Sequence, residues 1–218
     1  MKGIFITGTD TGVGKTHIAT QLARALTQKG LRVIPRKPVE SGCTRQNNEF
    51  IPADALALKT AANYSGSLQQ ICPYPFEPAV SPALAAKQVN KNLRIHDLKI
   101  ACLAGVTEND FLLVEGAGGF YSPLCSDGLN ADLAAALQLP VILVAEDRVG
   151  CINHCLLILE AAQHRDIFIA AIVLNRISEA PASMHNAAEL ALHTSCPIFP
   201  HSLNCDVFHN FVLGSFCP

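Results

Sequence analysis

Charged residues are scarce in this sequence, and neither sign of charge dominates. Only 16% of the 218 residues are Asp, Glu, Lys or Arg, and the formal net charge is −2. An average globular chain has roughly 25% charged residues. Because half of the residues are hydrophobic, the composition excludes a disordered, coiled-coil or fibrous protein. Without a basic excess, we expect no nucleic-acid partner.

Long apolar runs are also missing, and we expect no leader sequence. No run approaches the roughly 18 apolar residues that span a bilayer. The apolar stretch at the N-terminus, residues 1–7, is too short for a signal peptide and runs directly into a glycine-rich loop. We therefore expect a cytoplasmic protein with no membrane partner.

The nine cysteines do not form paired motifs. They are scattered along the chain without a single Cys-x-x-Cys pair. A zinc site needs ligand pairs at close spacing, and disulfides need an oxidising compartment. The pattern predicts packed or partly exposed thiols in a reducing compartment.

Several short segments are apolar throughout instead of alternating with polar residues. They cover residues 3–7, 111–115, 141–145 and 168–175, and such runs are typical of strands buried on both faces. Segments rich in Ala and Leu lie between them and predict helices over residues 16–29, 95–104, 131–137, 152–164 and 183–193. The alternation predicts an α/β fold in a single domain over residues 1–218. Its core is a doubly wound, mostly parallel sheet with helices on both faces.

Residues 40–92 are less regular. Prolines are dense between residues 72 and 78, and proline removes a backbone donor from helices and sheets. We expect no regular structure around these prolines and a long excursion over the sheet edge, near the ligand-binding end.

The strongest motif is a glycine-rich loop that follows the first apolar strand and opens a helix. It reads Gly8-Thr9-Asp10-Thr11-Gly12-Val13-Gly14-Lys15-Thr16. Glycines allow backbone N–H groups to surround phosphate oxygens, and the helix N-terminus adds a positive dipole end. Lys15 would reach the β- and γ-phosphates, and Thr16 would bind Mg²⁺. Five residues separate Gly8 from Gly14, one more than usual, so this is a variant phosphate loop; the alternative is an ordinary glycine-rich turn.

Three further segments place polar side chains at the ends of expected strands. Lys37 follows the second expected strand, where it would offset charge on a transferring phosphoryl group. Glu115 ends a buried strand, as a Mg²⁺ ligand of a nucleotide site does, and Gly116, Ala117, Gly118 and Gly119 follow it. Asp54 is either a second carboxylate of the site or a helix-start residue.

The fourth segment is Gly150-Cys151-Ile152-Asn153-His154, which opens a helix after the strand at residues 141–145. The free N–H groups of a helix start can hold a carboxylate. From the residues alone, we favour the simpler interpretation, in which Asn153 is a helix cap and Cys151 is a packed thiol.

Together these segments resemble the dethiobiotin synthetase family, in the expected order from the first strand to about Asn175. The matching strings are Thr7-Gly8-Thr9-Asp10-Thr11 with Val13-Gly14-Lys15-Thr16, Lys37-Pro38-Val39 with Ser41-Gly42, Asp54-Ala55-Leu56, Tyr74 with Ser81-Pro82, Val114-Glu115-Gly116-Ala117-Gly118-Gly119 with Pro123-Leu124, Gly150-Cys151-Ile152-Asn153-His154, and Asn175. The combination is far more specific than any one motif.

The resemblance implies a phosphate-loop NTPase fold and an ATP-dependent ligase of biotin synthesis. Such an enzyme converts 7,8-diaminopelargonate, CO₂ or bicarbonate, and ATP into dethiobiotin, ADP and phosphate. A substrate amine takes up CO₂ to form a carbamate, ATP phosphorylates it to a carbamic-phosphoric anhydride, and the second amine closes the cyclic urea.

The resemblance also implies a role for each matching residue. Lys15, Lys37 and Thr11 would be catalytic, and Thr16, Asp54 and Glu115 would surround Mg²⁺. Asn175 would read the adenine. The remaining ATP-binding residues would be Gly8, Thr9, Asp10, Gly12, Val13, Gly14, Gly116, Ala117 and Gly118. Substrate contacts would come from Lys37, Ser41 and Gly118, and from Gly150, Cys151, Ile152 and Asn153 of the other subunit of a homodimer.

The sequence departs from the family pattern in two places. Gly12 stands where some family members carry an acidic residue, so a contact of that side chain is absent. Residues 196–202 lack the glycine expected before an adenine-binding loop.

Other proteins of the same fold are less well matched. A partitioning ATPase would carry an extra lysine early in the loop, and none lies between Gly8 and Gly14. A membrane-bound relative should have a basic amphipathic tail, but residues 208–218 contain no Lys or Arg. An amidotransferase-like ligase would need a glutaminase domain, for which 218 residues leave no room. A non-catalytic nucleotide-binding module remains open.

Overall fold

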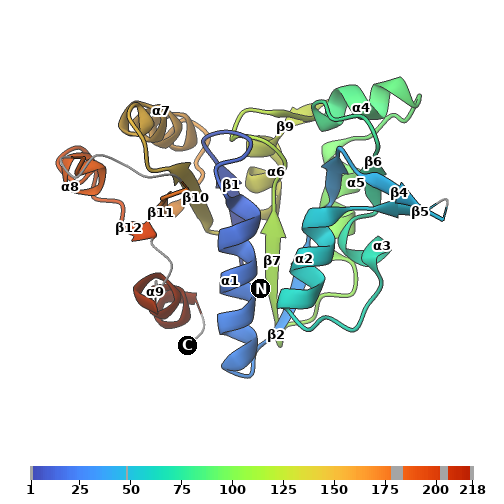
Figure 1. The fold of residues 1–218 in the computed structure, drawn as a ribbon, viewed down its shortest axis with the longest axis horizontal. Coiled ribbons are helices and arrows are strands. Elements are labelled where there is room, and N and C mark those ends of the chain that lie inside the picture. The colour runs from blue at the N-terminus through green and yellow to red at the C-terminus, as the bar shows by residue number, and fades with distance from the viewer. Residues whose placement is uncertain (1, 48, 178–183, 202–205, 217–218) are drawn as a thin grey trace.

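Six strands form one parallel sheet, and β1 (Lys2–Gly8) lies in its interior (Figure 1). The computed structural model describes residues 2–47, 49–177, 184–201 and 206–216. The strand order is β12-β11-β10-β1-β7-β2, and every neighbouring pair runs parallel. The other strands are β2 (Arg32–Arg36), β7 (Asp110–Glu115), β10 (Val141–Glu146), β11 (Ile169–Asn175) and β12 (Ile198–His201).

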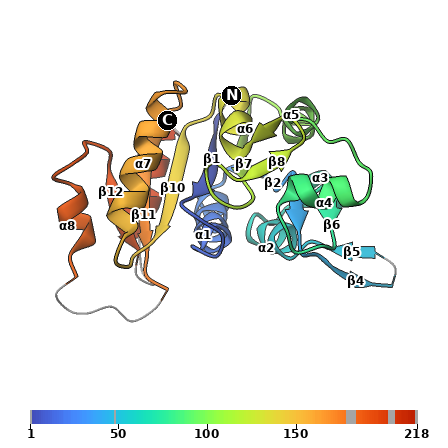
Figure 2. The ribbon, with the colours of Figure 1, turned by 90° about the horizontal axis from the view of Figure 1, so that it is seen from above.

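Helices cover both faces of this sheet, which confirms the predicted fold class (Figure 2). One face carries α1 (Lys15–Gln28), α2 (Ala53–Ala61) and α9 (Asp206–Phe216), and the other carries α5 (Ile95–Leu103), α6 (Asn130–Leu137) and α7 (Cys151–Gln163). The short helix α8 (Asn186–Leu190) lies beside α7. Within the described ranges, no helix combines the length and apolar character that crossing a bilayer requires.

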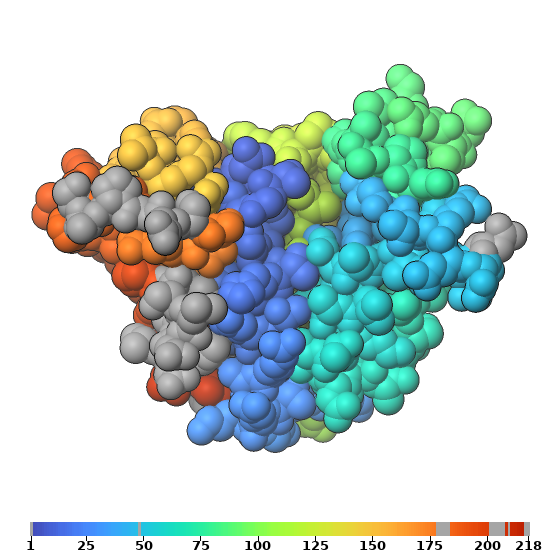
Figure 3. Space-filling view, viewed as in Figure 1, coloured from blue at the N-terminus to red at the C-terminus, as the bar shows by residue number. Residues whose placement is uncertain are grey.

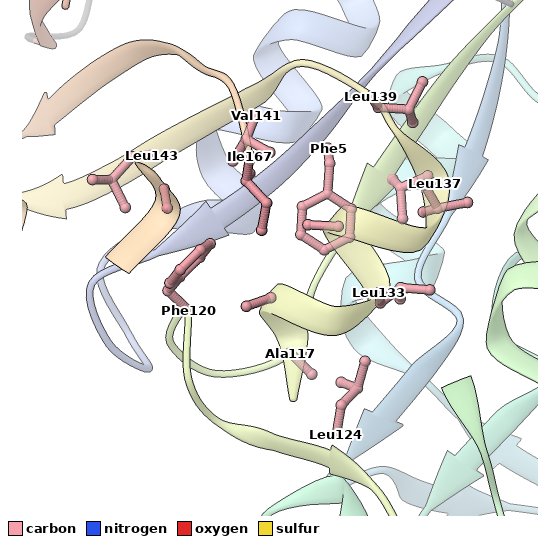
Figure 4. Packing of buried hydrophobic residues seen from close by; sticks show 14 of the residues in the cluster. Phe5, Ala117, Phe120, Leu124, Leu133, Leu137, Leu139, Val141, Leu143 and Ile167 are labelled. Atoms are coloured by element: carbon pink, nitrogen blue, oxygen red, sulfur yellow. The ribbon is translucent and has the colours of Figure 1, made fainter. Parts of the chain in front are cut away.

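The core consists of two apolar layers, one on each face of the sheet. Along β1, Ile4 and Ile6 pack into the layer beneath α1, whereas Phe5 packs into the layer beneath α6. All three side chains are fully buried. Figure 4 shows Phe5 among leucines of α6 and neighbouring strands. Because successive side chains of a strand point to opposite faces, a strand covered on both sides must be apolar throughout, as the sequence predicted.

The sheet changes direction at β1, which places the ligand edge. The chain passes from β7 on one side of β1 to β10 on the other. In open parallel sheets, ligands bind beyond the carboxyl ends of the strands at such a switch point. The loop after β1, residues 9–14, lies at this point.

Residues 40–92 contain more regular structure than predicted. They form α2, α3 (Leu68–Ile71) and α4 (Pro82–Gln88), together with β3 (Val39–Ser41), β4 (Thr44–Gln46), β5 (Glu49–Ile51) and β6 (Tyr74–Phe76). The expectation for the prolines was wrong: Pro75 lies in β6, which pairs with β3 in a two-stranded sheet. A strand with only one neighbour tolerates proline because one of its edges makes no ladder bonds. In Figure 3 this excursion, cyan to green, flanks the N-terminal segment in blue.

The predicted strands and helices correspond to observed elements, with small shifts at their ends. The helix expected over residues 183–193 is shorter, because α8 covers Asn186–Leu190 and residue 183 lies outside the described residues. The hairpin of β8 (Pro123–Cys125) and β9 (Gly128–Leu129), the edge strand β12 and the helix α9 were not predicted.

Candidate active site

The glycine-rich loop connects β1 to α1 and has the geometry of a phosphate loop. Gly14 caps α1 with a φ of 94°, a left-handed conformation that favours glycine. At the start of the loop, a Cβ on Gly8 would lie 2.7 Å from Cγ2 of Val13. The Nζ of Lys15 donates to the carbonyl of Asp10 at 2.7 Å. The lysine is therefore folded back over the loop, with a main-chain oxygen as its acceptor.

Next to this loop lies a cavity of about 650 Å³ at the carboxyl edge of the sheet. It gathers residues from four separate parts of the chain: the phosphate loop, the segment after β2, the excursion and the loop after β7. The lining residues are Thr11, Gly12, Gly14, Lys15, Thr16, Lys37, Glu40, Ser41, Asp54, Ala79, Val80, Ser81, Pro82, Glu115, Ala117, Gly118 and Ser122.

Lys37 lies at the centre of the charged groups. Its Nζ is 2.6 Å from Oε1 of Glu115 and 2.8 Å from Oδ2 of Asp54. It also donates to the carbonyl of Gly116 at 3.1 Å. The Oγ1 of Thr16 donates to the same Glu115 oxygen at 2.8 Å. Two predicted segments, the phosphate loop and the segment around Lys37, thus meet on the carboxylate that ends β7.

The two lysines are shifted in opposite directions. Burial, followed by repulsion from Lys37, lowers the pKa of Lys15 to about 8. Burial also disfavours the charged form of Lys37, but attraction by Glu115 and Asp54 outweighs it and raises the pKa of Lys37. Lys37 is therefore held as a cation, whereas Lys15 loses its proton as the pH rises through about 8.

Asp54 is held in place by a neighbouring carboxylate. The side chain of Glu40 accepts hydrogen bonds from the backbone N–H groups of Asp54 at 3.0 Å and Ala55 at 3.1 Å. Glu40 thereby provides hydrogen-bond acceptors for two N–H groups in the first turn of α2, which have no partner within the helix. Attraction by Lys37 outweighs burial and lowers the pKa of Asp54. Both interpretations of Asp54 apply, because it lies at a helix start and its carboxylate enters the site.

Not every predicted site residue lines this cavity. Asn175 is buried at the end of β11, and its Nδ2 donates to the carbonyl of Val13 at 3.0 Å. Thr9 and Asp10 line a second cavity of about 570 Å³ beside α7. The remaining predicted residues that lie outside the main cavity are Gly8, Val13, Gly116, Gly150, Cys151, Ile152 and Asn153.

The segment 150–153 starts α7. Gly150 is the cap residue, with a φ of 91°, so the interpretation of Asn153 as the cap is wrong. Cys151 is buried, as the packed-thiol interpretation expects, and Asn153 is exposed. Within one subunit this segment does not reach the cavity.

Sequence reasoning missed several residues of the site. Ala79, Val80 and Ser122 line the cavity without belonging to any motif we assigned. Glu40 stands inside the segment around Lys37, but its role as a helix cap depends on a contact fourteen positions away. Asn130, at the start of α6, bonds to the loop after β7. A single Asn before an apolar helix resembles an ordinary cap, so only the fold reveals these contacts.

Comparison with known proteins identifies the family of this chain. Residues 2–201 match the AAA domain family. The chain is 42% identical to the ATP-dependent dethiobiotin synthetase BioD of Vesicomyosocius okutanii, over 94% of this chain and 91% of that protein. It is 41% identical to the BioD of Anaeromyxobacter dehalogenans strain 2CP-1, over 88% and 85%. The chain belongs to the dethiobiotin synthetase family.

Solved structures of distant proteins share the fold. A ParA family ATPase from Chlorobium tepidum superposes with a TM-score of 0.56 at 17% identity, covering 97% of this chain and 88% of that one. The septum site-determining protein MinD of Pyrococcus horikoshii gives 0.53 at 17% identity, covering 98% and 85%. At such identities the likeness concerns the phosphate-loop NTPase fold, while the family follows from the close relatives.

Proposed function

We propose that the cavity makes dethiobiotin from 7,8-diaminopelargonate, CO₂ or bicarbonate, and ATP, and releases ADP and phosphate. The observation that carries this proposal is the convergence of Lys15 and Lys37 on one cavity beside a phosphate loop. Two anions must meet in the reaction, a carbamate oxygen and a phosphoryl group. Clustered cations in a buried site make such a contact favourable.

In this proposal the phosphate loop binds the triphosphate of ATP. The N–H groups of the loop and the start of α1 face the phosphates, and Lys15 exchanges its bond to the Asp10 carbonyl for phosphate oxygens. Asn175 reads the adenine from the end of β11. The hydrogen bond from Asn175 to the carbonyl of Val13 supports this role, because it connects the side chain to the same loop.

The carbamate forms when one substrate amine attacks CO₂ and loses a proton. A carbamate oxygen then attacks the γ-phosphorus, and the bond to ADP breaks. The second amine attacks the carbonyl carbon, and phosphate leaves as the ring closes. Lys37 and Ser41 would hold the carbamate, with Thr11 and Gly118 at the reacting end. The value of this arrangement is that it aligns the two anions before they react.

The side chains of Thr16, Asp54 and Glu115 are suited to Mg²⁺. All three offer oxygen, which this ion prefers, and Oε2 of Glu115 is buried without a hydrogen-bond partner among the described residues. In the same ranges, no group of three or more His, Cys, Asp and Glu side chains is placed to share a metal, so phosphate and water would complete the coordination. When bound, Mg²⁺ would neutralise charge on the phosphates.

A homodimer would complete the substrate site. Gly150, Cys151, Ile152 and Asn153 of one subunit would bind the substrate carboxylate of the other. Apolar side chains surround this segment at the surface: Val149 is 80% exposed, Leu157 56% and Tyr121 48%. A two-fold interface that covers them would remove apolar area from water.

We place the reaction in the cytoplasm. The seven cysteines within the described ranges are all unpaired, and six of them are buried; Cys205 and Cys217 lie outside these ranges. A reducing compartment keeps thiols in this state.

The deciding experiment measures phosphate release and dethiobiotin together. The purified chain is incubated with ATP, Mg²⁺ and bicarbonate, with and without diaminopelargonate, and products are identified by mass spectrometry. We expect phosphate and dethiobiotin in equal amounts, and both only with diaminopelargonate. Phosphate release that is independent of diaminopelargonate would instead indicate an ATPase switch of the same fold.

A further inference from the structure

Asn130 is a fully buried side chain whose contacts lie in the loop after β7. It is the first residue of α6, and among the described residues its side chain hydrogen-bonds only within residues 116–119, which we name the post-β7 loop. Its Oδ1 accepts from the N–H of Ala117 at 3.2 Å, and its Nδ2 donates to the carbonyls of Ala117 and Gly119. Figure 4 shows α6 packed beside Ala117.

The first of these bonds controls a carbonyl that contacts Lys37. The N–H of Ala117 and the C=O of Gly116 belong to one planar trans peptide unit, so they point in opposite directions. Asn130 holds the N–H end, and the Nζ of Lys37 donates to the C=O end at 3.1 Å. Asn130 thus fixes the orientation of an acceptor of Lys37.

The second bond orients a donor beside the cavity. The C=O of Ala117 is bonded to Asn130, so the N–H of Gly118 in the same peptide unit points away from Asn130. Ala117 and Gly118 both line the cavity. Within the described residues, the N–H of Gly118 makes no hydrogen bond in this structure. It is available to an anionic ligand.

The third bond connects the post-β7 loop to the phosphate loop. Asn130 donates to the carbonyl of Gly119 at 2.9 Å, and the other end of that peptide unit, the N–H of Phe120, donates to the carbonyl of Gly8 at 3.0 Å. Gly8 is the first residue of the phosphate loop. A displacement of Asn130 would therefore move both the post-β7 loop and the phosphate loop, which lie on two sides of the cavity.

The close packing of Asn130 against the post-β7 loop also explains why residue 116 is a glycine. A Cβ on Gly116 would lie 2.6 Å from Oδ1 of Asn130, closer than such atoms approach. Gly116 leaves the space that the Asn130 amide occupies.

We propose that Asn130 is a positioning residue of the reaction: it holds three peptide units so that Lys37, the Gly118 N–H and the phosphate loop face one another. The inference rests on the proposed function, since it assigns the Gly118 N–H to the anionic carbamate or phosphoryl oxygens. A side chain that merely stabilised the loop would affect folding without a selective effect on the chemical step.

The test compares Asn130→Asp with Leu133→Ala. The aspartate keeps the volume but turns a donor toward two carbonyls into an acceptor that repels them. Leu133 lies in the same helix and is also fully buried, but its apolar side chain packs in the core and makes no hydrogen bond to the post-β7 loop. Dethiobiotin formation is measured at a temperature at which both variants are folded, together with thermal unfolding and binding of an ATP analogue.

We expect Asn130→Asp to lower kcat by about a hundredfold, the usual loss when one aligned donor is removed. The Kd for the ATP analogue should change by less than about threefold, because most phosphate donors remain. Leu133→Ala should lower the unfolding temperature with kcat within about twofold of the unmodified chain.

Gly116→Ala tests the same contact from the other side, and it decides the matter if Asn130→Asp does not fold. It should also lower kcat selectively, because the added Cβ displaces the Asn130 amide. A kcat within twofold of the unmodified chain in either folded variant overturns the proposal, as does an equal loss in Leu133→Ala. Absence of dethiobiotin from the unmodified chain would instead contradict the proposed function.

Discussion

The ammonium nitrogen of Lys37 lies 2.6 Å from a carboxylate oxygen of Glu115, and both side chains are buried at the centre of the site. An ion pair without access to water is stable only as a pair, because each charge alone would pay a large desolvation cost. Removing Lys37 would therefore leave the buried carboxylate of Glu115 without its partner and destabilise the folded state.

Lys37→Ala should consequently affect both turnover and stability. We expect kcat to fall by orders of magnitude, since charge developing between carbamate and phosphate is no longer offset. The free energy of unfolding should fall by about 3–5 kcal/mol, because Glu115 is left as an unpaired buried charge. Urea unfolding and steady-state kinetics measure the two effects.

A double variant separates these effects. In Lys37→Ala with Glu115→Gln, the buried carboxylate is gone, so much of the lost stability should return. Turnover should remain low. Near-normal turnover in the single Lys37→Ala chain would contradict the catalytic assignment of this lysine.

The lowered pKa of Lys15, about 8, predicts an alkaline limit of activity. Above this pH the empty site loses the ammonium that should bind phosphate, so kcat/KM for ATP should decline as the pH rises through about 8. The decline in kcat should come at higher pH, because bound phosphates favour the charged form. The Lys15→Arg variant retains its charge at high pH, so the alkaline decline of kcat/KM should disappear. If the pH profile of this variant is unchanged, the decline is due to another group.

The same shift has a consequence for stability. The pKa of Lys15 is below the unfolded value of 10.5, so the unfolded chain binds more protons between pH 8 and 10.5. The contribution of Lys15 to the free energy of unfolding therefore rises with pH across this window.

Much of the fold could be predicted because its cause is local. A strand covered on both faces needs an unbroken apolar run, and the segments around β1, β7, β10 and β11 have one. The edge strand β12 contains Pro200 and His201 and has a single neighbour, so its sequence carries no such signal. Likewise, the proline at position 75 led us to expect no strand there. The strand β6 forms because it pairs with β3, which the local sequence does not reveal.

The residues of the site were likewise predictable only where their role depends on local sequence. The phosphate loop was predictable because one continuous segment supplies both its backbone conformation and its side chains. Glu40 and Asn130 act through main-chain groups that are distant in sequence. A side chain that bonds to backbone places no demand on the residue type of its partner, and so it leaves no motif to find.

Turnover should require Mg²⁺ bound by Asp54 and Glu115, and Glu40 should affect how tightly this ion is bound. Excess chelator should abolish turnover, and a chain with both Asp54→Ala and Glu115→Ala should not respond to Mg²⁺. Glu40→Gln should raise the Mg²⁺ concentration needed for half-maximal turnover by about tenfold, because only one of its two atoms can still accept from α2 and Asp54 is less well held. Direct titration of Mg²⁺ into the complex with an ATP analogue gives a second measure.

The control for this prediction is Ser67→Ala. It removes the cap of α3, where Ser67 accepts from the N–H of Gln70, and it lies outside the cavity. Its Mg²⁺ requirement should be unchanged. If Glu40→Gln and Ser67→Ala respond alike, Glu40 contributes only to folding.

The shared substrate site can be tested by mixing subunits. Asn153 is exposed at the start of α7 and outside the cavity of its own chain, whereas Lys15 lines that cavity. Asn153→Ala and Lys15→Ala chains should each be nearly inactive, the first through weak substrate binding and the second through lost phosphate contacts. In a mixed dimer, one site combines the intact Lys15 of one subunit with the intact Asn153 of the other.

Random exchange of equal amounts makes half of the dimers mixed, and each mixed dimer has one intact site of two, so about a quarter of the unmodified activity should return. Sedimentation must first show dimers, and exchange must be followed with labelled chains. Monomers at working concentration, or no recovery despite exchange, would mean that each chain binds diaminopelargonate alone.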